Sequence, residues 1–117
     1  TGRRQERLTA LKEILESTYK IQVLDLCFDI RHLNEVEQAI LSLSAAHKKI
    51  DVLVNNAGLA AGLSTIQDGN LLHWEQMIDT NIKGLLYTTK FISNLMIENK
   101  KNEERDAYKK NEKSHAA

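Results

Sequence analysis

The segment Asp51–Gly58, which reads Asp-Val-Leu-Val-Asn-Asn-Ala-Gly, limits the possible folds of this chain more than any other. A short block of β-branched and aliphatic residues that ends in a polar turn is typical of a parallel strand covered on both faces. In open α/β sheets, ligands bind at the carboxyl ends of the strands. The segment therefore predicts a buried strand from Asp51 to Asn55, followed by a turn at a ligand-binding edge.

Three segments with helical periodicity and one further β-favouring run accompany this strand. The apolar residues recur at helical spacing from about Arg4 to Ser17, from about His32 to Ala46 and from about Leu71 to Glu98. The run from Ile21 to Phe28 is short, mainly apolar and β-favouring. Because helices and strands alternate along the chain, the sequence predicts an α/β fold with a parallel sheet.

Asn81 interrupts the apolar stripe of the last helical segment, three residues after Ile78 and four before Leu85. A buried amide without partners costs about 1–3 kcal/mol, so its hydrogen bonds must be satisfied. A structural asparagine or a helix bend is one interpretation of this position, and a functional amide is the other.

Composition excludes several classes of function. The 117 residues suffice for one domain, and the formal net charge of zero gives no support for nucleic acid or an anionic membrane as a partner. The single Cys27 has no second thiol in the chain, and the four histidines have no metal-binding spacing. No apolar stretch is long enough to span a membrane. We therefore expect a reducing, cytoplasmic setting without metal.

Arg3 and Arg4 follow what we interpret as the end of a strand and precede a helix. Two guanidiniums at that position are planar, permanently charged donors suited to a phosphate monoester. A solvated surface pair is the alternative interpretation, and the pair alone does not decide between them.

Together these segments resemble the middle of a short-chain dehydrogenase/reductase. Asn55-Asn56-Ala57-Gly58 is similar to that family's internal signature, and Asp79-Thr80-Asn81-Ile82-Lys83-Gly84 resembles its second one. The N-terminal run Thr1–Leu8, Thr-Gly-Arg-Arg-Gln-Glu-Arg-Leu, is similar to bacterial NADP-dependent 3-hydroxy acid (serine) dehydrogenases. The resemblance covers about Thr1 to Ile97 and implies a Rossmann-like, doubly wound parallel sheet.

The resemblance also implies the cofactor, the substrate class and the roles of individual residues. The cofactor would be NADP, and the reaction would be hydride transfer to or from a hydroxyl or carbonyl group of a small molecule, with a 3-hydroxy acid as the best guess. Asn81 would be the asparagine of the catalytic tetrad. The cofactor-binding residues would be Arg3 and Arg4 at the 2′-phosphate, Asp29 and Ile30 beside the adenine, and Asn55, Ala57 and Gly58 at the adenosine ribose. Enzymes of the family are expected to be homo-oligomers.

Other motifs of the family are not found in the chain. No Gly-rich phosphate loop and no Tyr-x-x-x-Lys pair are present, since Tyr19, Tyr87 and Tyr108 have no lysine four residues later. We therefore expect residues 1–98 to be a partial dinucleotide-binding domain containing the third and fourth strands, and residues 99–117 to be a charged, disordered tail. Such a fragment would be inactive alone. A non-catalytic interaction module and a non-functional truncation product are the alternatives.

Overall fold

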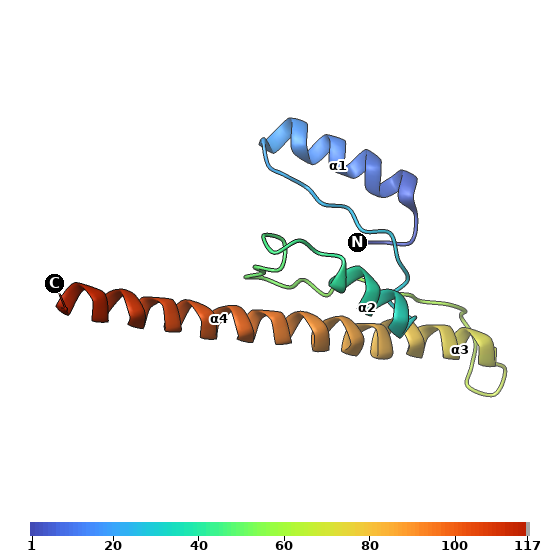
Figure 1. Ribbon diagram of the computed structural model, residues 1–117. Helices are drawn as coiled ribbons and strands as arrows, with labels where there is room; N and C mark the ends of the chain where they lie inside the picture. Colours follow the sequence, from blue (N-terminus) through green and yellow to red (C-terminus); the bar gives the residue numbers. More distant parts are fainter. Residues whose placement is uncertain (117) are drawn as a thin grey trace.

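The structure is a computed structural model that describes residues 1–116. Helix α1 spans Gln5–Tyr19 and helix α2 spans Leu33–Leu41. A long C-terminal helix follows in three consecutive parts, α3 (Leu71–Ile78), η1 (Asp79–Gly84) and α4 (Leu85–His115) (Figure 1). The three predicted helical segments are thus confirmed, although α2 ends in a turn before the predicted end at Ala46.

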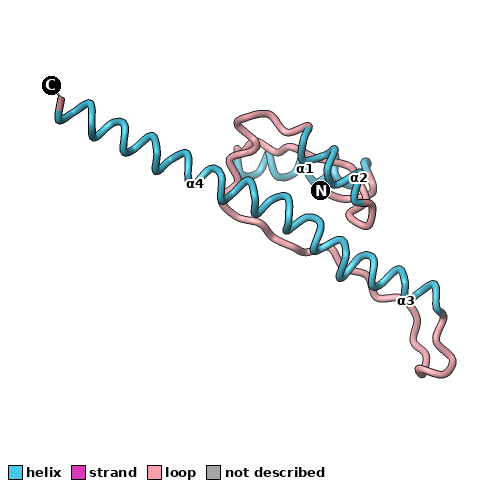
Figure 2. The backbone as a smooth tube through the Cα atoms, turned by 60° about the horizontal axis from the view of Figure 1, so that its bottom comes forward, coloured by secondary structure: helices cyan, strands magenta, loops and turns pink. Residues whose placement is uncertain are grey.

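The prediction of strands at Ile21–Phe28 and Asp51–Asn55 is wrong for this structure. Figure 2 shows both segments as irregular chain, and residues 1–116 contain no strand. The one β-type pairing there is an isolated parallel bridge between Gly2 and Cys27. In it the Gly2 N–H donates to the carbonyl of Leu26 at 3.2 Å, and the Phe28 N–H donates to the carbonyl of Gly2 at 2.9 Å.

The missing sheet has a direct physical cause. A strand exists only when a neighbouring segment supplies its ladder of hydrogen bonds, and apart from the bridge at Cys27 neither run has such a neighbour among residues 1–116. A cavity of about 360 Å³ lies between the two segments, lined by residues of both, including Leu26, Phe28, Leu53 and Val54. The two segments therefore stay unpaired with each other.

The core of the molecule lies between α2 and α4. Its buried side chains are Val36 and Ile40 of α2 and Ile92 of α4, of which Val36 is fully buried. Partly buried side chains surround them, namely Phe28, Ile30, Leu43, Ile50, Leu53, Tyr87, Phe91, Leu95 and Met96. Helix α1 stands apart from α4 in Figure 1 and has no buried residue.

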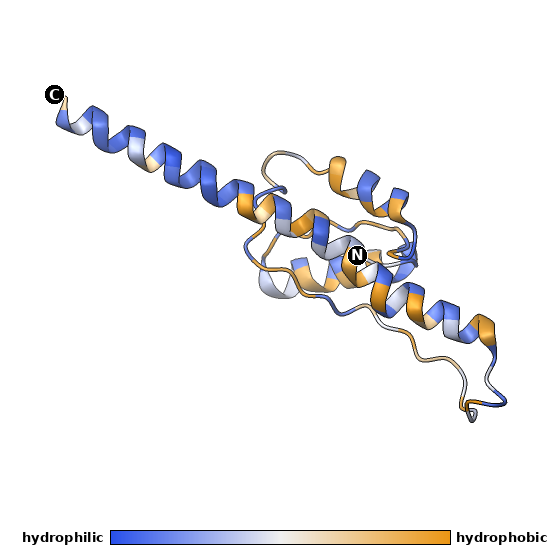
Figure 3. Ribbon diagram, turned by 90° about the horizontal axis from the view of Figure 1, so that it is seen from below, coloured by the Kyte–Doolittle hydropathy of each residue, from blue (hydrophilic) through white to orange (hydrophobic). Residues whose placement is uncertain are grey.

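The molecule is elongated because α4 extends well beyond this core. The radius of gyration is 19.6 Å, whereas a compact chain of this length would have about 13 Å. Residues 100–116 are exposed throughout, and Figure 3 shows that end of α4 as hydrophilic. We expected a disordered tail from residue 99, but the structure has a helix to His115. The segment lacks glycine and proline and is rich in lysine and glutamate, which favour a helix without any core-facing stripe.

No helix among residues 1–116 combines the length and the apolar character that a membrane crossing requires.

Candidate functional site

Asn81 lies in a π-helical turn, η1, between two α-helical segments. Single π turns inside α-helices occur frequently at functional sites. The Asn81 Oδ1 accepts a hydrogen bond from the Leu59 N–H at 2.8 Å, and its Nδ2 donates to the Leu59 carbonyl at 2.8 Å. Both halves of the amide are therefore satisfied by one residue of the loop that follows the asparagine turn. Asn81 is exposed, so the expectation of a buried amide is wrong, although both polar groups are paired. Its catalytic role stays a prediction.

The Asn-Asn-Ala-Gly turn lies along the same long helix. The Asn55 Nδ2 donates to Thr89 Oγ1 at 3.0 Å, and that hydroxyl donates to the Leu85 carbonyl at 2.7 Å. At the other end of the turn, a Cβ added to Gly58 would lie 3.7 Å from Asn81 Oδ1. One side-chain hydrogen bond thus joins the turn to the helix at Asn55, and the Asn81 side chain lies beside Gly58.

A cavity of about 320 Å³ opens beside this turn and collects three of the predicted cofactor residues. Ile30, Asn55 and Ala57 line it. The rest of its lining consists of Thr1, Val54, Asn56, Leu85 and Thr88. The lining combines two amide side chains and two hydroxyls with aliphatic groups, which suits a ligand that is part polar and part apolar.

A second cavity, of about 430 Å³, contains the predicted arginine pair. Arg3 and Arg4 line it together with Arg7 and Asn56. Because Asn56 and Thr1 line both cavities, the basic cavity adjoins the one beside the asparagine turn. Sequence reasoning missed Arg7, the third residue of α1.

Asp29 is held by a guanidinium that sequence reasoning also missed. The Arg31 Nε lies 3.0 Å from Asp29 Oδ1, and Arg31 Nη2 lies 2.6 Å from Asp29 Oδ2. Arg3 Nη1 lies 3.9 Å from the same carboxylate. The hydrogen bonds from Arg31 lower the pKa of the Asp29 carboxyl below its usual value, against a smaller opposing effect of burial. Asp29 is therefore an ionised anchor between Arg31 and Arg3.

The fold should depend on pH through Asp29. A carboxyl whose pKa is lower in the folded state stabilises that state above its unfolded pKa, and this stabilisation is lost as the pH falls through the folded pKa. We expect Asp29→Asn to be less stable than the unchanged chain at neutral pH, with the difference shrinking under acidic conditions. Urea unfolding followed by circular dichroism at several pH values measures this. A difference that is constant with pH would contradict the assignment to Asp29.

Within the part of the chain that the structure describes, no group of three or more His, Cys, Asp or Glu side chains could hold a metal ion.

Known proteins are similar to this chain in both sequence and structure. The sequence model of the short chain dehydrogenase family matches residues 1–103. The NADP-dependent 3-hydroxy acid dehydrogenase YdfG of Salmonella typhi is 47% identical over 98 residues, which are 84% of this chain and 38% of that protein. Serine dehydrogenase from Escherichia coli matches in structure with a TM-score of 0.73 and 42% identity, over 83% of this chain and 43% of that one.

A further solved structure, the closed form of serine dehydrogenase complexed with NADP⁺, matches with a TM-score of 0.72 and 40% identity. It covers 83% of this chain and 38% of that one. The chain thus spans about two fifths of the length of the relatives that it matches. Those relatives are Rossmann-fold dehydrogenases, so the resemblance inferred from the two motifs is confirmed. The family match over most of the chain, together with these identities, shows that the chain belongs to the short chain dehydrogenase family.

Proposed function

We propose that this chain supplies the adenosine side of an NADP(H) site in an oxidoreductase that transfers a hydride to or from a hydroxyl or carbonyl group. One observation carries the proposal. The arginine-lined cavity adjoins the cavity beside Asn55 and Ala57, with Asn56 in the wall of both. A phosphate-binding group and a nucleoside-binding turn are thus neighbours, as a phosphorylated adenosine requires.

The side chains present fit such a cofactor. Guanidiniums bind phosphate oxygens through planar pairs of N–H donors, and Arg3 and Arg4 bring two of them to one cavity. In this proposal Arg3 and Arg4 bind the 2′-phosphate, Asp29 and Ile30 border the adenine, and Asn55, Ala57 and Gly58 contact the ribose. When bound, NADP(H) supplies the hydride chemistry, and the protein supplies position and charge.

The remaining parts of the proposal concern the substrate and the proton donor. The relatives that the chain matches include an NADP-dependent 3-hydroxy acid dehydrogenase and serine dehydrogenase, so we propose a 3-hydroxy acid as the substrate class. Asn81 is proposed to serve the catalytic tetrad of the whole enzyme. Reduction of a carbonyl also needs a proton donor, and no Tyr-x-x-x-Lys pair occurs in these residues. We therefore propose that the 117 residues alone have no turnover.

Isothermal titration calorimetry with NADPH and NADH tests the proposal, because these ligands differ only in the 2′-phosphate. Charge-assisted hydrogen bonds contribute about 1.5–3 kcal/mol, so NADPH should bind at least about tenfold more tightly than NADH. Equal affinities, or binding of neither, would contradict the adenosine-side assignment. An assay with NADP⁺ and L-serine or 3-hydroxybutyrate should show no turnover, and measurable turnover would contradict the claim of inactivity.

A further inference from the structure

We propose that Arg31 sets the base selectivity of the proposed adenosine site, because it keeps the Asp29 carboxylate from accepting a hydrogen bond from the base. This inference rests on the proposed function, in which Asp29 and Ile30 border the adenine. A free carboxylate beside the base would favour adenine, whose 6-amino group is a donor, over a base with a carbonyl there. The contacts of Asp29 indicate that its carboxylate is not free.

Both carboxylate oxygens of Asp29 are occupied by donors of Arg31. The guanidinium Nε lies 3.0 Å from Oδ1 and 3.0 Å from Oδ2, and Nη2 lies 2.6 Å from Oδ2. The Arg31 backbone N–H also donates to Oδ1 at 3.0 Å. Because only 12% of the Asp29 side chain is exposed, little of the carboxylate remains for a ligand.

A base is a weaker competitor for these oxygens than Arg31 is. The hydrogen bonds from Arg31 join two opposite charges, and the planar fork of a guanidinium matches the two oxygens of a carboxylate. The adenine amino group is neutral and offers no such fork. Arg31 is also held two residues from Asp29 by the chain itself, whereas a ligand must be ordered from solution. The ion pair should therefore persist when a base is bound.

The turn that carries this ion pair is fixed by Glu35, the third residue of α2. The Asp29 N–H donates to Glu35 Oε2 at 2.8 Å, and the His32 N–H donates to the Asp29 carbonyl at 3.1 Å. His32 Nδ1 lies 2.8 Å from the other Glu35 oxygen. Since the backbone of Asp29 is held at both its N–H and its carbonyl, the residue cannot shift toward a ligand without breaking these bonds.

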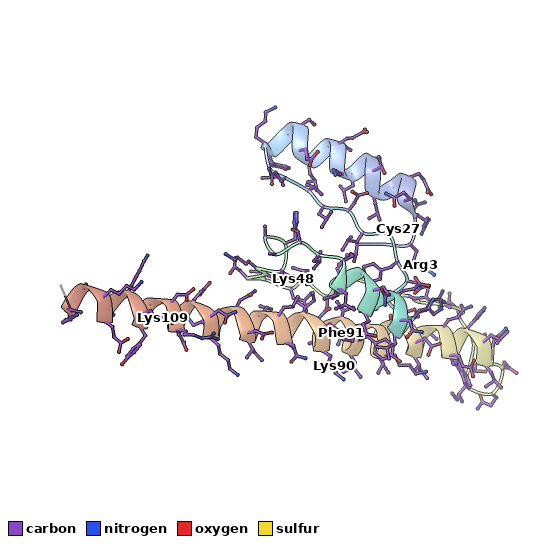
Figure 4. All side chains as sticks on the ribbon, in the orientation of Figure 1. Arg3, Cys27, Lys48, Lys90, Phe91 and Lys109 are labelled. Atoms are coloured by element: carbon purple, nitrogen blue, oxygen red, sulfur yellow. The ribbon has the colours of Figure 1, made fainter. Side chains whose placement is uncertain are left out.

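Ile30 is the residue of this turn that lines the cavity beside the asparagine turn. The lining of that cavity of about 320 Å³ within residues 1–116 includes neither Asp29 nor Arg31. Figure 4 shows Arg3 next to the segment that leads from Cys27 to α2, and Arg3 Nη1 lies 3.9 Å from Asp29 Oδ2. A base in the cavity would thus meet the aliphatic side chain of Ile30, which does not distinguish an amino group from a carbonyl.

Two reduced cofactors that differ only at the 6-position of the base test this inference. NADPH has the amino group, and reduced nicotinamide hypoxanthine dinucleotide phosphate has a carbonyl there. Calorimetry would measure both affinities in the unchanged 117-residue chain, Arg31→Met, Arg31→Lys, the double variant Arg31→Met/Asp29→Ala and the control Lys109→Gln. Lys109 lies far along the exposed part of α4 (Figure 4), and its substitution also removes one positive charge. Circular dichroism would check that each variant keeps its helices.

The unchanged chain and Lys109→Gln should bind the two cofactors with affinities within about twofold of each other. Arg31→Met frees the carboxylate, so NADPH should then bind about tenfold more tightly than the hypoxanthine cofactor. Arg31→Lys lacks the fork and should give a preference of about threefold. The double variant has no carboxylate, so its ratio should return to within about twofold. A merely structural role of Arg31 would weaken both cofactors equally and leave the ratio unchanged.

A preference for NADPH of more than about twofold in the unchanged chain would overturn the role of Arg31 and leave the proposed function standing. An unchanged ratio in Arg31→Met, or a ratio that does not return in the double variant, would have the same meaning. If Arg31→Met loses its helices, the ratio in Arg31→Lys decides. Failure of the unchanged chain to bind NADPH would overturn the proposed function, and this inference with it.

Discussion

Gly84→Ala is expected to destabilise the fold, even though alanine favours a helix more than glycine does. Gly84 is buried, and a Cβ built on it would lie 2.6 Å from Ile30 Cδ1 and 2.7 Å from Ile30 Cγ1. Overpacking of this kind costs about 1–3 kcal/mol. The gain in helix propensity is at most about 1 kcal/mol, so the clash should dominate. Urea unfolding followed by circular dichroism measures the change in the free energy of unfolding.

A second substitution at Ile30 isolates the contact. Ile30→Ala removes Cδ1 and Cγ1 and leaves only Cβ, which would lie 3.2 Å from a Cβ added to Gly84. In that background Gly84→Ala should cost little or be stabilising, which gives a coupling free energy of about 1 kcal/mol or more. Equal effects of Gly84→Ala in both backgrounds would contradict a tight contact. Because Ile30 also lines the cavity beside the asparagine turn, this contact connects the long helix to the proposed adenine side.

Asn81→Ala is expected to release the loop at Leu59 from the long helix. The substitution removes two hydrogen bonds of 2.8 Å, one from the Leu59 N–H and one to its carbonyl. Each contributes about 0.5–1.5 kcal/mol net, so the loop should open with a free energy lower by about 1–3 kcal/mol. Amide hydrogen exchange at Leu59 measures this directly and should become about ten- to a hundredfold faster.

Two matched variants give this measurement its controls. Asn81→Asp can still accept from the Leu59 N–H but, when ionised, cannot donate to the carbonyl, so its exchange rate should be intermediate. Asn94→Ala removes the same amide from an exposed position of α4 and should leave Leu59 unchanged. Unchanged exchange in Asn81→Ala would show that the two hydrogen bonds do not hold the loop.

The helices and part of the candidate site could be predicted from sequence because their signals are local. The apolar stripe and the absence of proline predicted the long helix as far as about Glu98. The interruption of the stripe at Asn81 suggested a structural asparagine or a helix bend, and the structure has a π turn there. The arginine pair was predicted from sequence to bind a phosphate, and in the structure both arginines line one cavity.

Other parts of the site depend on residues brought together from distant positions. Nothing in the local pattern indicates that Asn55 would bond to Thr89, or that Asn81 would bond to Leu59. Arg31 was missed because a guanidinium two residues after Asp29 is common on solvated turns. Only the structure shows that the Arg31 guanidinium donates hydrogen bonds to the Asp29 carboxylate.

By itself, the sequence indicated three helical segments and the family of the two asparagine motifs, but not the helix over residues 99–115. Helical hydrogen bonds join residues four apart and motifs are contiguous, so both signals are local. Tertiary structure alone decided whether the apolar runs Ile21–Phe28 and Asp51–Asn55 form strands. A strand takes its hydrogen bonds from another segment, so its β propensity is realised only where such a segment lies alongside. Within residues 1–116 that condition is met at Cys27, where the first run forms an isolated bridge with Gly2, and nowhere along the second run.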